Sequence, residues 1–136
     1  MQNKRNTAKW SRSKIILVDD EPDITFSFNM ALEDHGFVVD TFNDPLQALS
    51  SFKVGLYIMA VLDVKMPEMN GFELASKIRE LDNKVKIAFM SAFDIPEENL
   101  KTTTPIVYEE KSNIIRKPIS IVDFVSIIKE KVENKK

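Results

Sequence analysis

Tyr57-Ile58-Met59-Ala60-Val61-Leu62-Asp63 is a run of six apolar residues that ends in one carboxylate. A short apolar run with β-branched residues, preceded by Gly55 and followed by Pro67, is typical of a strand buried on both faces of a sheet. Asp63 then stands where the strand stops, and the carboxyl ends of parallel strands open into the ligand crevice of such sheets. Asp63 is therefore a candidate site residue, although an aspartate here can also simply start a turn.

The size and composition of the chain indicate one globular domain. Its 136 residues are enough to bury a substantial core. A net charge of −2 gives no bulk attraction to nucleic acid, so we expect no direct nucleic-acid binding. The absence of cysteine and the single histidine exclude disulfides, thiolate metal sites and histidine-rich metal clusters. No apolar run approaches the roughly 18 residues of a membrane span, and the polar N-terminus lacks a signal-type stretch. We expect a cytoplasmic protein.

The ends of the chain differ from its middle. Residues 1–13 have one large apolar residue, Trp10, no periodicity, and four basic residues, Lys4, Arg5, Lys9 and Arg12. We interpret them as a flexible basic arm, which is either a solvated extension or a docking tail with local nucleic-acid contacts. The folded domain is expected over residues 14–133, and residues 134–136 are expected to be a frayed C-terminus.

The remaining segments alternate between strand and helix patterns. Apolar runs predict further strands at residues 14–18, 37–42, 85–90 and 114–116. Helical spacing predicts helices over residues 22–35, 45–55, 70–81 and 121–132. Residues 93–112 show the least readable pattern, which allows a further short helix at residues 96–101. Five strands that alternate with about five helices predict an α/β fold, with a doubly wound parallel sheet covered on both faces.

Local signals mark the ends of these helices. Pro22 suits a first helical turn, and Gly36 is a C-terminal stop. Asn70 with Glu73 has the pattern of a capping box, and Ser120 is a good N-cap. His35, the lone histidine, lies close to the end of a predicted helix, so we interpret it as a helix-end residue and not as a ligand.

Polar residues follow the strands that would lie side by side. In the flavodoxin-like strand order 2-1-3-4-5, the second strand is at the edge, and it ends in Phe42-Asn43. The four contiguous strands end in Asp19-Asp20, Asp63, Ser91 and Lys117. Each residue alone is a weak signal, but together they predict one site at the carboxyl edge of the sheet.

These residue types point to phosphoryl chemistry. The carboxylates of Asp19, Asp20 and Asp63 would repel one another unless a cation joined them, and an all-oxygen ligand set suits Mg²⁺ best. Lys117 adds a positive charge and Ser91 a hydroxyl, so the set would hold a dianionic phosphoryl group. The natural reaction is attack by Asp63 on an activated phosphorus, which gives an aspartyl phosphate.

Over roughly residues 14–133 the sequence resembles the receiver domain of two-component response regulators. The matching motifs are Asp19-Asp20, Asp63 with Met66-Pro67 and Gly71, Ser91-Ala92, and Lys117-Pro118. The resemblance implies that Asp63 is the phosphoacceptor. It also implies that Mg²⁺, or Mn²⁺ in its place, binds to Asp19, Asp20, Asp63 and the backbone carbonyl of Lys65. Ser91 would bind a phosphoryl oxygen and move towards it on activation, Lys117 would pair with the phosphate, and the Lys117-Pro118 bond would be cis.

The sequence departs from the family pattern at two places. Ile114 occupies the position of the usual Tyr or Phe switch residue, so the standard readout through the fourth helix, fifth strand and fifth helix is not expected to operate unchanged. The stretch between Ser91 and Lys117 is longer than usual and contains Pro105, which suggests a rebuilt or disordered fourth helix. Lys65 and Phe93 flank the acceptor and the hydroxyl. They would slow self-hydrolysis by shielding the phosphorus, unless both side chains point to solvent.

The resemblance implies a signalling switch. A sensor histidine kinase or a histidine phosphotransfer protein would donate to Asp63, and the altered surface would bind a downstream protein or form a phosphorylation-dependent dimer. Position 65 is lysine, where a haloacid-dehalogenase-type phosphatase needs aspartate, and no nucleotide-binding loop is present. We therefore expect no enzyme activity beyond the domain's own phosphorylation and dephosphorylation.

Two alternatives remain open at this point. The chain is either a single-domain regulator or the receiver of a longer DNA-binding transcription regulator, since the last predicted helix ends close to the end of the sequence. The other alternative is a pseudo-receiver, an interaction module that is never phosphorylated. The presence of both acids of the pair together with Asp63, Ser91 and Lys117 argues against a pseudo-receiver.

Overall fold

The computed structural model of the protein describes residues 12–92 and 114–133. The elements in chain order are β1 (Lys14–Val18), α2 (Pro22–Asp34), β2 (Val38–Phe42), α3 (Pro45–Ser51), β3 (Tyr57–Asp63), α4 (Gly71–Leu81), β4 (Lys86–Ser91), β5 (Ile114–Arg116) and α7 (Ile121–Glu133). The predicted helix at residues 96–101, Phe93, most of the N-terminal arm and the C-terminal residues 134–136 lie outside the described residues.

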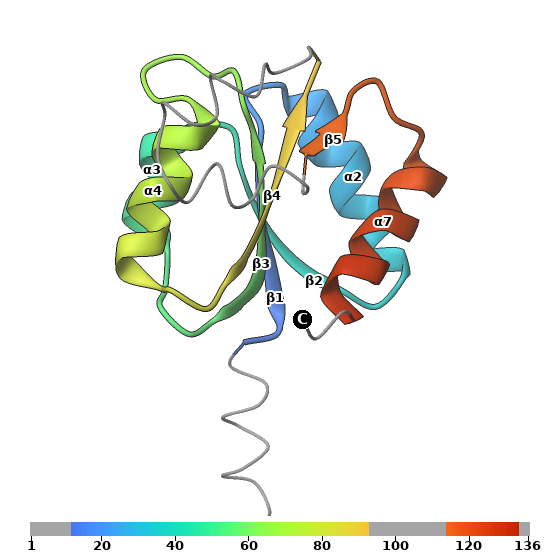
Figure 1. Ribbon diagram of the computed structural model, residues 1–136. Helices are drawn as coiled ribbons and strands as arrows, with labels where there is room; N and C mark the ends of the chain where they lie inside the picture. Colours follow the sequence, from blue (N-terminus) through green and yellow to red (C-terminus); the bar gives the residue numbers. More distant parts are fainter. Residues whose placement is uncertain (1–11, 93–113, 134–136) are drawn as a thin grey trace, which may run out of the picture.

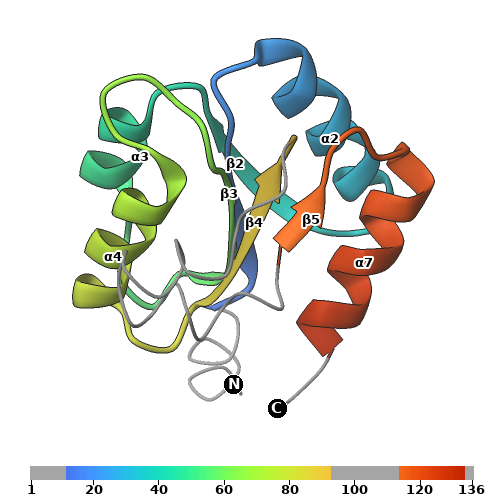
Figure 2. The ribbon, with the colours of Figure 1, turned by 45° about the horizontal axis from the view of Figure 1, so that its top comes forward.

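The sheet has the predicted topology. Its five strands are parallel and lie in the order β2-β1-β3-β4-β5. Both ribbon views show α3 and α4 on one face of the sheet and α2 and α7 on the other (Figures 1 and 2). The α/β doubly wound fold class predicted from the alternating patterns is therefore confirmed.

The central strand β3 is buried on both faces, as its apolar sequence predicts. Ala60 and Leu62 belong to the core cluster beneath α4, whereas Met59 and Val61 belong to the cluster beneath α2 and α7. Because all four side chains are 1% exposed or less, β3 contributes to both halves of the core. Its burial places Asp63, the last residue of the strand, at a fixed point on the carboxyl edge of the sheet.

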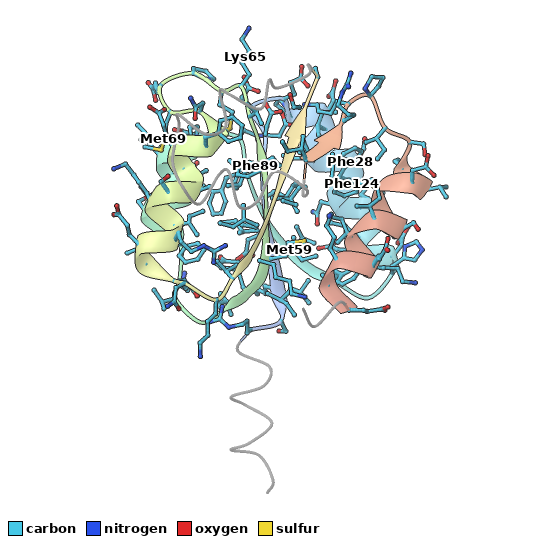
Figure 3. The ribbon with its side chains drawn as sticks, viewed as in Figure 1. Phe28, Met59, Lys65, Met69, Phe89 and Phe124 are labelled. Atoms are coloured by element: carbon cyan, nitrogen blue, oxygen red, sulfur yellow. The ribbon has the colours of Figure 1, made fainter. Side chains whose placement is uncertain are left out.

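An aromatic pair lies in each half of the core, and Figure 3 labels Phe28 and Phe124 of one pair and Phe89 of the other. On the α2 and α7 face, the rings of Phe28 and Phe124 are stacked with centroids 4.1 Å apart. On the α4 face, the rings of Phe72 and Phe89 pack edge to face with centroids 4.9 Å apart. The first pair fixes α2 against α7, and the second fixes α4 on β4, because aromatic side chains bury large areas with specific geometry.

Most predicted helix ends are confirmed. Asn70 and Glu73 form a complete capping box at the start of α4, and the Ser120 hydroxyl accepts a hydrogen bond from the backbone N–H of Asp123 at 3.0 Å. Gly36 follows α2 with a φ of 92°, a conformation that glycine adopts at low cost. His35 is the C-cap of α2, and its ring Nδ1 lies 2.9 Å from the carbonyl oxygen of Ala31.

The prediction for α3 was wrong at its C-terminal end. The helix ends at Ser51 and not at Gly55, because Phe52 turns to an extended conformation and packs against Tyr57 with ring centroids 5.2 Å apart. Gly55 has a φ of 84° and belongs to the turn that leads into β3. The bounds of β2 and β4 also differ from the predicted ones by one residue, which is ordinary for strand ends.

The amino edge of the sheet is held together by Asp82, the C-cap of α4, whose side chain is 2% exposed. Its carboxylate accepts hydrogen bonds from the backbone N–H groups of Gly55, Lys84 and Val85 at 3.0 to 3.2 Å. The Arg12 guanidinium donates to the same carboxylate at 3.0 Å and to the Tyr57 carbonyl at 3.1 Å. Arg12, expected in the N-terminal arm, therefore contacts the domain.

In the described part of the chain, no helix combines the length and the apolar character needed to cross a membrane.

Candidate functional site

The three predicted acids meet at the carboxyl edge of the sheet. Val18 of β1 is level with Leu62 of β3, so Asp19 is carried beyond its strand to the height of Asp63. Asp20 follows in the turn to α2. One carboxylate oxygen from each of Asp19, Asp20 and Asp63 lies within 4.8 Å of the other two. Asp19 and Asp63 are buried, with exposures of 0% and 6%, so their charges are poorly screened by water.

Lys117 follows β5, the edge strand opposite β2, and completes the site. Its backbone N–H donates to the Ser91 carbonyl at 2.8 Å, which continues the pairing of β5 with β4 by one residue. Its ammonium group lies 3.0 Å from Asp19 Oδ2 and 3.1 Å from Asp63 Oδ1. The Lys117-Pro118 peptide bond is cis, as the resemblance implies. Lys117 therefore bridges the two buried carboxylates.

The electrostatics of the site follow from this crowding. Burial, together with the nearby charges of Asp19 and Asp20, raises the pKa of Asp63 from 3.8 to about 6, against the lowering effect of Lys117. Burial also raises the pKa of Asp19. Although burial alone would favour the neutral amine, hydrogen bonds to Asp19 and Asp63 raise the pKa of Lys117. A single lysine thus compensates the acids only in part.

Hydrogen bonds to the backbone and to Asn43 also hold the acid pair Asp19-Asp20. The backbone N–H of Glu21 donates to Asp19 Oδ1 at 2.9 Å, and the Asp19 N–H donates to the Phe42 carbonyl at 3.1 Å. Asn43 donates from its side-chain Nδ2 to the Asp19 carbonyl at 2.8 Å. Sequence reasoning gave no role to Asn43, because it follows the edge strand and lies 24 residues from Asp19 in the chain.

The β3–α4 loop fits closely around the end of β3. The N–H of Gly71 donates to the Val64 carbonyl at 2.8 Å. A Cβ atom on Gly71 would overlap the carbonyl oxygen of Asp63 and lie 3.0 Å from Val64 Cα. Glycine is therefore required at position 71 by the close approach of α4 to the backbone that carries Asp63.

The other predicted residues fall at different distances from the acids. Ser91 is 1% exposed and ends β4, on the wall of the same hollow as Asp63 and Lys117. The Lys65 side chain also lines this hollow and points away from the molecule at the top of Figure 3. Ile114 is half-buried and packs on the core cluster beneath α4. Its aliphatic side chain has no phenol and no ring to turn inward. Phe93 lies outside the described residues.

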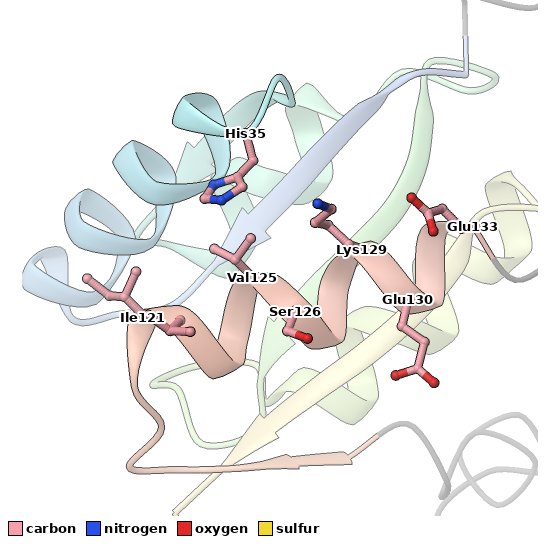
Figure 4. A pocket seen from close by; sticks show the side chains of 8 residues that line it. His35, Ile121, Val125, Ser126, Lys129, Glu130 and Glu133 are labelled. Carbon is pink, nitrogen blue, oxygen red and sulfur yellow. The ribbon is translucent and has the colours of Figure 1, made fainter.

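The site is open to solvent through a hollow of about 490 Å³. Its walls carry the acids Asp20, Glu21 and Asp63 with Ser91 and Lys117. A larger hollow of about 670 Å³ lies along α7 beneath His35 (Figure 4). None of the residues that end the strands lines the larger hollow, whose walls are Val125, Lys129 and their neighbours on α7. The smaller hollow is therefore the candidate site.

The donor set of the site fits a hard divalent cation. All three candidate ligands are carboxylates, and hard cations such as Mg²⁺ prefer oxygen ligands. The hollow beside them leaves room for water or phosphate oxygens, which Mg²⁺ usually keeps among its ligands. A bound cation would also offset the carboxylate charge that Lys117 alone leaves uncompensated.

The fold and this acidic edge define the class of flavodoxin-like α/β domains with a candidate cation site at the carboxyl ends of their strands. Residues 15–129 match the family model of the response regulator receiver domain, and the chain belongs to this family of two-component systems. The resemblance found in the sequence is thereby confirmed.

Relatives and solved structures agree with this assignment. The chain is 31% identical over 120 residues to the transcriptional regulatory protein TrcR of Mycobacterium tuberculosis, covering 88% of this chain and 45% of TrcR. It is 28% identical over 117 residues to the response regulator receiver protein CpdR of Brucella abortus, covering 86% and 94% of the two chains. The chain thus spans less than half the length of TrcR but nearly all of CpdR.

The fold is shared with solved receiver domains. The non-phosphorylated HemR receiver domain of Leptospira biflexa superposes with a TM-score of 0.79 at 21% identity, covering 92% of this chain and 98% of that one. A CheY-like receiver domain protein of Methanospirillum hungatei superposes with a TM-score of 0.71 at 26% identity, covering 90% and 95%.

Proposed function

We propose that this receiver domain is a phosphorylation-dependent switch, in which Asp63 accepts a phosphoryl group in a Mg²⁺-dependent reaction. The observation that carries the proposal is the Lys117 ammonium, 3.0 Å from Asp19 and 3.1 Å from Asp63, on the wall of a hollow that Asp20 and Ser91 also line. On this proposal Asp63 is the nucleophile and the acid pair binds the cation, while Lys117 supplies an ammonium and Ser91 a hydroxyl to the same hollow of about 490 Å³.

The reaction follows from these roles. An Asp63 carboxylate oxygen attacks the phosphorus of a phosphohistidine, the new O–P bond forms, and the P–N bond to the imidazole breaks as the imidazole leaves. Lys117 stabilises the negative charge on the equatorial oxygens, and the Ser91 hydroxyl donates to one of them. When bound at the three acids, Mg²⁺ would neutralise charge on the carboxylates and the phosphoryl oxygens. With a pKa of about 6, Asp63 is mostly ionised at neutral pH and ready to attack.

The proposed donor is a sensor histidine kinase or a histidine phosphotransfer protein, and the proposed outcome is altered binding of a downstream protein or a second copy of the chain. On this proposal the domain works in the cytoplasm and catalyses nothing beyond its own phosphorylation and dephosphorylation. TrcR is named a transcriptional regulatory protein and CpdR a receiver protein. Both a receiver within a longer transcription regulator and a single-domain regulator are therefore consistent with the proposal.

Intact mass spectrometry after incubation with Mg²⁺ and acetyl phosphate tests the proposal. We expect the wild type to gain one phosphoryl mass, and we expect Asp63→Asn and the chelator-treated wild type to gain none. Asp44→Asn is the matched control, because it removes an acid charge close to the carboxyl edge while asparagine remains a good N-cap for α3. A wild type that gains no phosphoryl mass with any divalent cation would favour the pseudo-receiver alternative.

A further inference from the structure

Asn43 directly follows the edge strand β2, and its side chain donates two hydrogen bonds, one of them to the acid pair Asp19-Asp20. Its Nδ2 donates to the Asp19 carbonyl at 2.8 Å and to the Thr25 hydroxyl at 3.0 Å. Thr25 is 4% exposed, and its hydroxyl donates in turn to the Pro22 carbonyl at 3.1 Å. Asn43 thus connects the end of β2 to the end of β1 and to the first turn of α2.

The two partners of Asn43 are satisfied together by a group that donates two hydrogen bonds. The Asp19 carbonyl can only accept, and the Thr25 hydroxyl has already used its hydrogen on Pro22. Both partners therefore need a donor, and the two hydrogens of one NH₂ group satisfy both. Neither a hydroxyl with a single hydrogen nor a carboxylate would replace Asn43 in both contacts.

The carbonyl that Asn43 holds belongs to the peptide unit between Asp19 and Asp20. Because a peptide unit is planar, fixing its oxygen also fixes its rotation and the direction in which the chain leaves towards Asp20. The preceding peptide unit is held at its N–H, which donates to the Phe42 carbonyl at 3.1 Å. The Asp19 side chain is held by Glu21 and Lys117. The hydrogen bond from Asn43 thus holds the one peptide unit that joins Asp19 to Asp20.

We propose that Asn43 is a positioning residue of the cation site, which holds the Asp19–Asp20 peptide unit so that the two carboxylates face the same ion. The inference rests on the proposed function, since it requires that the acids bind a cation. Hydrogen bonds to ligand residues typically change metal affinity by about 10- to 100-fold when they are lost. Because Asn43 is exposed, its replacement leaves the hydrophobic core intact.

Isothermal titration calorimetry of the full chain with Mg²⁺ tests this role. Asn43→Leu keeps the approximate shape of the side chain but removes both donors, and we expect its Kd for Mg²⁺ to rise about tenfold or more. Asp44→Ala is the matched control. The Asp44 side chain, next to Asn43 in the chain, caps α3 by accepting from the Leu46 N–H at 3.0 Å, and it makes none of the contacts to Asp19. We expect Asp44→Ala to lower the melting temperature without changing the Kd for Mg²⁺.

A second readout separates positioning from general damage. At saturating Mg²⁺, Asn43→Leu should be phosphorylated by acetyl phosphate at nearly the wild-type rate, with only the Mg²⁺ concentration at half-maximal rate increased. Asn43→Ala provides the same test should the leucine variant fold poorly.

Two results would overturn the inference while the proposed function stands. These are Asn43 variants that bind Mg²⁺ as tightly as the wild type, or an equal loss in Asp44→Ala. A wild type that binds no Mg²⁺ would overturn both the inference and the proposed function.

Discussion

Asp63 is a residue whose ionised form opposes folding. Its pKa is about 6 in the folded domain against an ordinary value of 3.8, so the folded state binds the proton more tightly. The contribution of Asp63 to the free energy of unfolding is therefore largest below about pH 4. It is lost as the pH rises from about 4 to about 6. Above that range Asp63 is a buried charge beside other acids.

Asp63→Asn should stabilise the domain when no divalent cation is present. Removing the buried charge is expected to raise the free energy of unfolding at pH 7.5 by up to about 3 kcal/mol, and by much less at pH 4. Urea denaturation at the two pH values in the presence of a chelator measures this difference. Asp34→Asn, at the exposed end of α2, should change little. An unchanged or lower stability of Asp63→Asn at pH 7.5 would contradict the electrostatic account.

The glycines at positions 71 and 36 are required for different reasons, which predicts different effects of alanine. Gly71→Ala must push apart α4 and the backbone of Asp63, so we expect a loss of about 2 kcal/mol or more in stability and slower phosphorylation. Gly36 has open space around its Cα but a φ of 92°, so Gly36→Ala should cost about 1 kcal/mol and leave phosphorylation unchanged. Equal phosphorylation rates in the two variants would show that the close contact at Gly71 does not position Asp63.

At the scale of single elements, the N-terminus of α4 is the clearest case of a local sequence signal. Asn70 Oδ1 accepts from the Glu73 N–H at 2.8 Å, and Glu73 Oε1 accepts from the Asn70 N–H at 2.9 Å. Asn70→Ala removes one of these bonds and should lower the free energy of unfolding by about 1 kcal/mol, whereas Asn70→Ser should lose less. Chemical denaturation of the two variants measures the difference, and indistinguishable stabilities would mean that the capping box contributes nothing.

Elements and site residues were predictable where a local pattern determines them. The apolar run of β3 and the capping box of α4 depend on neighbours in sequence, and both were found there. The end of α3 was mispredicted because Phe52 leaves the helix to pack against Tyr57, a contact that only the folded chain creates. Asn43 was missed for the same reason, since its partners are 24 and 18 residues away in the chain. The acids were predictable because parallel strands bring their carboxyl ends together whatever the details of packing.

On the scale of the whole molecule, the two edges of the sheet carry buried acids with opposite effects on folding. At the carboxyl edge, Asp63 faces other carboxylates, and its ionised form destabilises the folded state. At the amino edge, burial of Asp82 would by itself raise its pKa, but backbone N–H groups and Arg12 outweigh this and lower the pKa from 3.8 to about 2. The donors around Asp82 come from the segments before β1, β3 and β4. Ionised Asp82 therefore joins three parts of the chain that are distant in sequence.

This arrangement predicts an acid transition that depends on Asp82. Because its folded pKa is lower than its unfolded pKa, the stabilisation is complete above about pH 4 and is lost as the pH falls through 2. Asp82→Asn keeps one acceptor oxygen but loses the charge, so we expect a loss of about 2 kcal/mol in the free energy of unfolding at pH 7, and a difference that disappears near pH 2. Unfolding curves in urea from pH 7 to pH 2 measure both effects.

Phosphorylation of Asp63 is the internal control for this variant, because Asp82 lies at the opposite edge of the sheet. Folded Asp82→Asn should accept a phosphoryl group from acetyl phosphate at the wild-type rate. Arg12→Ala should reproduce part of the stability loss, since the backbone N–H groups of Gly55 and Lys84 remain. If Asp82→Asn unfolded in acid at the same pH as the wild type and with the same stability at pH 7, the three segments would be held by core packing alone. The hydrogen bonds to Asp82 would then only satisfy a charge that burial had made costly.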